Sequence, residues 1–116
     1  MRKSSQKLNP SFKRQIQKTL AQTVSDIKET EKAHTFLNSF LTDVEYEVLA
    51  KRLAIAYWLK KGRSYNNIKN NLKVSSATIA SVQSKTDNPG FQMALKNLEA
   101  EEWANVWEKK IKKFIK

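Results

Sequence analysis

The sequence predicts an all-α fold of about six helices in a chain of 116 residues, a length that fits one domain. Three observations lead to this expectation. The chain holds only two glycines and two prolines, alternating runs of β-branched residues are scarce, and apolar residues recur at intervals of three and four in several segments. A chain this short builds only a small core, so we expect it to bury further surface against a second copy of itself.

The first third of the chain predicts an arm followed by two helices. The opening "MRKSSQKLNP", residues 1–10, has no apolar period and predicts a flexible basic arm. Asn9-Pro10-Ser11 then predicts a helix start, because proline is favoured in the first turn. One helical face follows at spacings of four, four, four and three: Phe12, Ile16, Leu20, Val24 and Ile27. A second segment carries Phe36, Leu37, Phe40 and Leu41, and we expect residues 11–116 to form a single domain.

The middle of the chain predicts a long helix over about 43–61. Thr42 and Asp43 are candidate start residues, with Glu45 in the first turn. The second half of this helix, "LAIAYWL" at 53–59, is apolar on every side and should be buried all round. Gly62 follows two lysines and predicts the end of the helix.

Residues 64–84, "SYNNIKNNLKVSSATIASVQS", predict two short helices joined by a tight turn. Their apolar positions follow intervals of four, two, five and three, which neither one helix nor one strand produces: Ile68, Leu72, Val74, Ile79 and Val82. Ser75 or Ser76 can cap the second helix. This spacing is typical of a helix-turn-helix over 65–84, whose second helix lies in the major groove of DNA. An ordinary helical hairpin is the alternative, since Lys69 replaces the usual small residue and Lys73 the usual glycine.

The end of the chain predicts a turn and a last helix. Asp87-Asn88-Pro89-Gly90 marks the turn, and the helix runs from Phe91 towards the end of the chain. Trp103 and Trp107 are four residues apart on it, so we expect them to pack in the core or in a dimer rather than to stack on nucleic-acid bases.

The charge of the chain predicts a polyanionic partner. The formal net charge is +11, residues 1–18 hold six cations and no acid, and the last eight residues hold five lysines. A small, strongly basic domain of this kind commonly binds nucleic acid, although the charge also improves solubility.

Other classes of protein find little support in the residues. The absence of cysteine excludes disulfides and thiolate metal sites, and His34 is the only histidine, so no metal site is expected. Paired carboxylates and glycine-rich phosphate loops are missing, so we expect no enzyme. The apolar stretches are too short to span a bilayer, and no signal peptide is recognisable. We therefore expect a protein of the bacterial cytoplasm, associated with the nucleoid and not with membranes.

The candidate site residues fall into two groups on double-stranded DNA. Those on the second helix of the motif should contact bases: Ser76, Ala77, Thr78, Ala80, Ser81 and Ser84. Basic residues around the motif should contact phosphates: Lys60, Lys61, Arg63, Lys69, Lys73 and Lys85. Without arginine or asparagine on the reading face, specificity would depend on hydroxyls, thymine methyl groups, water and DNA shape.

The quoted segments resemble the tryptophan repressor superfamily, in its less characterised repressor-like branch. The likeness runs from Phe36 to Glu99 through a Phe-Leu pair, "LT", "LAKRLAI", a "GRS" break, "IKNNLKVSSATI" and "NPGFQMALKNLE". It implies an intertwined, all-helical homodimer that presents two helix-turn-helix units to DNA, as a transcriptional regulator and specifically a repressor. Such a dimer would also cover residues 53–59, which a monomer of this length should leave exposed.

The resemblance also implies a corepressor pocket between the central helix and the reading helix, clamped by two arginines. Arg52 matches the first arginine and Thr42 a threonine of that pocket, but no arginine stands near Ser81. We therefore expect no cofactor, with an L-tryptophan-like corepressor as the alternative and any other small-molecule effector unknown. Two other functions stay open: a helical dimeric interaction protein without DNA readout, and a basic RNA-associated protein.

Overall fold

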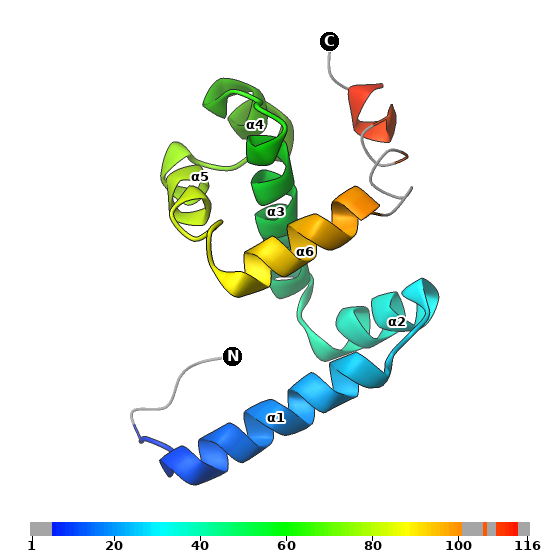
Figure 1. Ribbon diagram of the computed structural model, residues 1–116, viewed down its shortest axis with the longest axis vertical. Helices are drawn as coiled ribbons and strands as arrows, with labels where there is room; N and C mark the ends of the chain where they lie inside the picture. The colour runs from blue at the N-terminus through cyan, green and yellow to red at the C-terminus, as the bar shows by residue number, and fades with distance from the viewer. Residues whose placement is uncertain (1–5, 101–105, 107–108, 114–116) are drawn as a thin grey trace. The chain divides into compact units, whose positions relative to one another are not determined.

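The described residues are helical throughout their regular structure, which confirms the predicted all-α class. The computed structural model describes residues 6–100, 106 and 109–113, and these contain no strand. The chain divides into two compact units, residues 1–43 and 44–116 (Figure 1). Residues 1–5 of the expected arm, together with Trp103 and Trp107, lie outside the described residues.

The first unit contains α1 (Pro10–Asp26) and α2 (Thr30–Phe40). The predicted start of α1 is confirmed, because the Asn9 side chain accepts hydrogen bonds from the backbone N–H groups of Ser11 at 2.8 Å and Phe12 at 3.4 Å. The apolar row of α1 is exposed rather than buried: Phe12, Ile16, Leu20 and Val24 keep 42–51% of their surface accessible. This unit therefore presents an uncovered apolar face.

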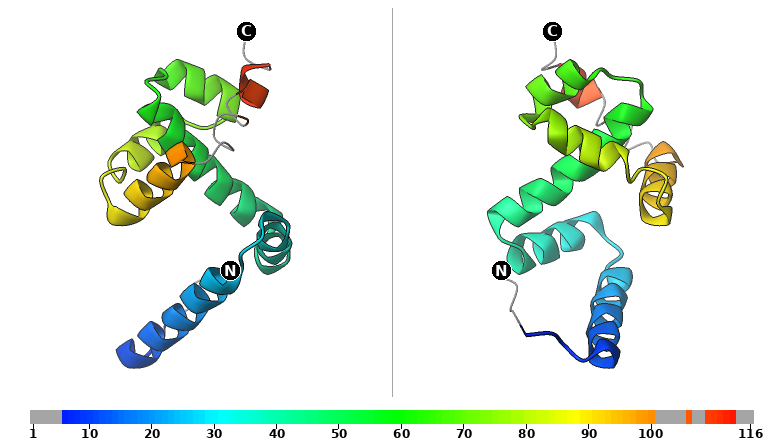
Figure 2. Two further views of the ribbon diagram at one scale, coloured as in Figure 1. Left: turned by 45° about the vertical axis from the view of Figure 1, so that its right-hand side comes forward. Right: turned by 90° about the vertical axis from the view of Figure 1, so that its left-hand side faces the viewer.

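The second unit contains α3 (Asp43–Lys60), α4 (Tyr65–Leu72), α5 (Ser76–Gln83) and α6 (Pro89–Ala100). Its core forms around the second half of α3, where residues 54–58 are at most 3% exposed. The side chains that complete the buried cluster come from the other three helices: Ile68, Ile79, Val82, Leu95 and Leu98. Figure 1 shows α6 crossing α3, and the views in Figure 2 show α4 and α5 beside the second half of α3.

The predicted burial of residues 53–59 is confirmed for its centre, Ala54–Trp58, while Leu53 and Leu59 are half-buried. The expectation that a dimer covers this segment is wrong, however. α4, α5 and α6 of the same chain already cover this segment, so its burial gives no support to a dimer.

The ends of α3 and α6 show where glycine and proline act. Gly62 has a φ of 80° and ends α3 as predicted, because a side chain is disfavoured in this left-handed conformation. Residues 84–88 form the turn before α6. Pro89 and Gly90 are already helical, so α6 begins two residues earlier than expected, with proline at the position in a helix where its missing N–H costs nothing.

Beyond α6, Val106 and residues 109–112 are again helical, and Ile111 packs against the core of the second unit. Among the described residues, none of the helices combines the length and the hydropathy needed to cross a bilayer.

Candidate nucleic-acid interface

The break between α4 and α5 occurs at Lys73. This residue adopts a left-handed conformation with φ 55° and ψ 54°, and its backbone N–H donates to the carbonyl of Lys69. The Val74 N–H donates to the same carbonyl at 3.4 Å. The chain therefore leaves α4 in a left-handed turn that usually holds glycine, and residues 65–84 are two helices, as the apolar spacing predicts.

Both helices of the motif begin with a serine cap. The Asn67 N–H donates to the Ser64 hydroxyl at 3.1 Å, and the Thr78 N–H donates to the Ser75 hydroxyl at 3.1 Å. The hydroxyls of Ser75 and Thr78 also share a hydrogen bond of 2.9 Å. Each cap satisfies an amide that would otherwise lack an intrahelical partner, so the start of α5 is fixed at Ser75.

The five apolar positions of the motif all reach the core. Ile68 and Ile79 are fully buried and Val82 is 5% exposed, while Leu72 and Val74 pack against the cluster from its edge.

Two polar contacts add to this packing. The Tyr65 hydroxyl of α4 donates to the side-chain oxygen of Gln83 in α5, and the Lys51 ammonium donates to the backbone carbonyl of Lys73 at 3.5 Å. Together the apolar and polar contacts hold α5 at one angle to α4 and α3.

The outer side of α5 is open to solvent. All six residues expected to contact bases are exposed: Ser76, Ala77, Thr78, Ala80, Ser81 and Ser84. The Ser84 hydroxyl donates to the carbonyl of Ser81 at 2.7 Å, and that of Thr78 belongs to the cap. The face therefore consists of short hydroxyl and methyl groups, and a slim helix of this kind can approach a DNA groove closely.

The basic residues expected to contact phosphates separate into two groups. Those at the end of α3 interact within the chain. The Lys60 ammonium lies 3.1 Å from the Glu99 carboxylate, Lys61 lies 5.4 Å from the ring centre of Tyr57, and Arg63 lies 4.7 Å from that of Trp58. Arg63 also donates to the Asn67 side-chain oxygen at 3.3 Å.

The second group surrounds the motif itself. Lys69, Lys73 and Lys85 are exposed, and no ion pair engages them within the part of the chain that the structure describes. They are therefore better placed than Lys60 or Arg63 to bind an external anion.

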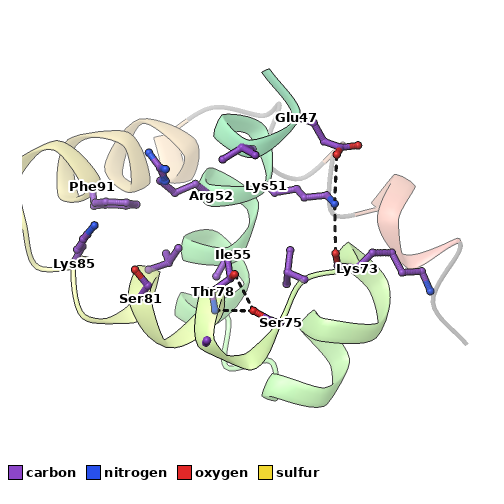
Figure 3. Close-up of a pocket in the computed structure, with 14 residues that line it drawn as sticks. Glu47, Lys51, Arg52, Ile55, Lys73, Ser75, Thr78, Ser81, Lys85 and Phe91 are labelled. Atoms are coloured by element: carbon purple, nitrogen blue, oxygen red, sulfur yellow. Dashed lines mark hydrogen bonds and ion pairs between the residues drawn. The ribbon is translucent and has the colours of Figure 1, made fainter. Parts of the chain in front are cut away.

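A groove of about 560 Å³ lies between α3 and α5 and ends at Phe91 of α6 (Figure 3). Ile55 and Val82 contribute apolar surface to it, and Ala77, Thr78 and Ser81 line it from α5. Arg52 lines it as the resemblance implies, whereas Thr42 belongs to the other unit.

The groove is mainly cationic. Lys51, Arg52, Lys73 and Lys85 line it, against the single carboxylate of Glu47, which lies 3.7 Å from the Lys51 ammonium. The sequence did not point to Glu47, Lys51 or Phe91. Glu47, Lys51 and Ile55 are one turn apart on α3, which places them on one face, but only the packing shows that α5 lies opposite. Metal-binding groups of three or more His, Cys, Asp or Glu do not occur among the described residues.

Comparison with known proteins identifies the family. The model of the Trp repressor protein family matches residues 15–99. The chain is also similar to a Bacillus subtilis (strain 168) protein named uncharacterized protein YerC, with 29% identity over 85 residues that cover 72% of this chain and 82% of that protein. No solved structure matches the chain. With the family model covering well over half of its residues, the chain belongs to the Trp repressor family of DNA-binding regulators.

Proposed function

We propose that this protein is a sequence-specific transcriptional regulator, specifically a repressor, that binds double-stranded DNA as a homodimer and enters the major groove with α5. The exposed serine- and alanine-rich face of α5, set on a helix-turn-helix whose five apolar positions reach the core, is the observation that carries this proposal. Membership in a family of regulators supports a binding function rather than catalysis.

The chemistry of the α5 face sets the mode of readout. Its six exposed serine, alanine and threonine residues offer no guanidinium or amide group for a bidentate contact with guanine or adenine, and the side-chain oxygen of Gln83 at the end of α5 accepts from the Tyr65 hydroxyl. Hydroxyl contacts, methyl contacts with thymine, bridging waters and DNA shape remain. Phosphates beside the major groove of the DNA would be bound by Lys69, Lys73 and Lys85. Each contact would add about 0.9 to the slope of log K against log salt concentration.

Exposed apolar side chains support the homodimer. The described residues leave eleven large hydrophobic side chains exposed: Leu8, Phe12, Ile16, Leu20, Val24, Phe40, Val44, Val48, Leu49, Met93 and Val106. Many of them lie on α1 and on the first half of α3, outside the core of the second unit. A second copy of the chain would cover such surface, and the resulting two-fold axis would match a palindromic operator.

Selection of binding sites from a random duplex library tests this function, with Ser81→Glu as the diagnostic variant. The wild-type chain should enrich a palindromic site. Ser81→Glu should bind that site at least about tenfold more weakly, because a carboxylate in the major groove repels phosphate and cannot replace a hydroxyl contact.

Ser39→Glu on exposed α2 makes the same change of charge and serves as the control, with helicity measured by circular dichroism for both variants. Unchanged binding by folded Ser81→Glu would show that α5 is not the reading helix.

The same library separates the two alternative functions. A steep dependence on salt without sequence preference would favour the basic RNA-associated protein, and the absence of binding would favour the interaction protein. Either result would contradict the proposed regulator.

For the groove between α3 and α5, we propose that DNA binding requires no cofactor. The arginine expected near Ser81 is missing, although Lys85, in the turn after α5, lines the same groove. Affinity for the selected site should therefore be equal with and without L-tryptophan. A rise in affinity would favour the alternative, in which the cationic groove binds a tryptophan-like corepressor.

A further inference from the structure

α1 has two opposite faces, one apolar and one basic. Between Phe12 and Leu20, apolar residues alternate with cations at steps of two: Phe12, Arg14, Ile16, Lys18 and Leu20. Two positions correspond to about 200° around a helix of 3.6 residues per turn. Arg14 and Lys18 therefore lie on the side opposite the apolar row and one turn apart from each other.

The charges of α1 oppose its dipole. Its first turn contains no acid and its last turn no base. Instead Lys13 stands in the first turn and Asp26 is the last residue. Cations near a helix N-terminus and anions near its C-terminus are unfavourable, so the stability of the helix does not account for this arrangement.

These cations also have no partner within the described chain. Lys7, Lys13, Arg14 and Lys18 are exposed and make no ion pair with any described residue. Residues 1–25 contain no acid that could serve as a local partner. By contrast, Lys32, Lys51 and Lys60 are each paired with a glutamate. The basic face of α1 is thus available to an external polyanion.

We propose that Arg14 and Lys18 form a second DNA-binding surface, which contacts phosphates of the same duplex that the helix-turn-helix reads. This role rests on the function proposed above. If a second copy covers the apolar row, the opposite face stays outward, and cations one turn apart suit a sequence-independent contact with the backbone.

An anionic membrane is the less favoured partner of this surface. The apolar row holds one residue per turn, which is narrow for a helix that inserts into a lipid interface.

The test compares two double variants of equal charge in the full chain. Arg14→Gln/Lys18→Gln removes the basic face. Lys28→Gln/Lys96→Gln removes two other exposed cations and is the matched control. Binding to the selected duplex is measured over a range of salt concentrations, together with binding to anionic vesicles.

The first variant should lower the slope of log K against log salt by up to about 1.8. The preference for the selected site over random duplex should stay at its wild-type value. The control should change the slope much less. Equal slopes for the two variants would overturn the proposal, because the effect would then reflect net charge alone. A loss of vesicle binding without a change in DNA binding would overturn it as well.

A cross-link gives a second readout that net charge does not affect. The chain has no cysteine, so Ser11→Cys, seven residues before Lys18 on the basic face, accepts a single photoactivatable probe. It should cross-link to the selected duplex, whereas Ser39→Cys on α2 should not. Absence of the Ser11→Cys cross-link in a chain that still prefers the selected site would overturn the role of α1 alone. If the wild-type chain showed no preference for any duplex sequence, the proposed regulator itself would be overturned.

Discussion

Lys73 is the residue whose local geometry matters most for the motif. It is the one described residue other than glycine with a positive φ, at 55°. A Cβ in this conformation lies too close to the following carbonyl, whereas glycine avoids the clash. The lysine at this position therefore costs stability, and the residue lines the groove between α3 and α5.

Lys73→Gly should accordingly separate stability from DNA binding. The free energy of unfolding should rise by about 1 kcal/mol, because the strain disappears, while the salt slope of DNA binding falls by about 0.9 as a phosphate contact is lost. Urea unfolding and binding titrations measure the two effects.

Lys69→Gly provides the matched control, since it removes the same charge from within α4. It should destabilise the chain by about 1 kcal/mol. If Lys73→Gly destabilises the chain as well, the left-handed position is not strained.

At the scale of elements, α5 depends on its surroundings. A helix of eight residues is far too short to be stable alone in water. Burial of Ile79 and Val82, the Ser75 cap and the contact between Tyr65 and Gln83 hold it in place. The exposed face of α5 can therefore consist of small residues, serine, threonine and alanine, because none of them is needed for packing.

Substitutions of Ser75 test whether the cap stabilises α5 independently of DNA binding. Ser75→Ala should lower the free energy of unfolding by about 1 kcal/mol, because the Thr78 N–H loses its acceptor. Ser75→Asp should keep most of the stability, since aspartate is an equally good cap, yet weaken DNA binding by repelling phosphate. Thermal unfolding and DNA titration distinguish the variants. Equal stability of Ser75→Ala and wild type would show that the cap does not matter.

The element boundaries were largely predictable from sequence. The start of α1 followed from Asn9-Pro10, the end of α3 from Gly62, and the end of α4 from the irregular apolar spacing around Val74. Such boundaries are predictable because caps and left-handed turns depend on neighbouring residues alone. The start of α6 was missed by two residues, since proline and glycine read equally well as a turn or as a first helical turn.

At the scale of the whole molecule, the chain combines an uncovered apolar surface with a large positive charge. Its net charge is +11, and the described residues leave eleven large hydrophobic side chains exposed. In the proposed homodimer a second copy would cover the exposed apolar rows, and the positive charge would attract the DNA.

Leu20→Glu tests the use of the apolar row of α1. A carboxylate in a buried dimer interface is costly, so the variant should shift sedimentation from dimer towards monomer at micromolar concentration. Ser25→Glu makes the same change of charge on the opposite face of α1 and should sediment as the wild type does. A Leu20→Glu variant that remains dimeric would exclude this row from the interface.

The sequence by itself determined the helical class, the break at Lys73 and the exposed face of α5, because these follow from the spacing of residues close together in the chain. Only the tertiary structure decided what covers residues 53–59, that Lys60 pairs with Glu99 and Arg63 with Trp58, and that α3 and α5 enclose a cationic groove. Such contacts depend on which faces of separate helices meet, and the periodicity of a single helix carries no information about its neighbours.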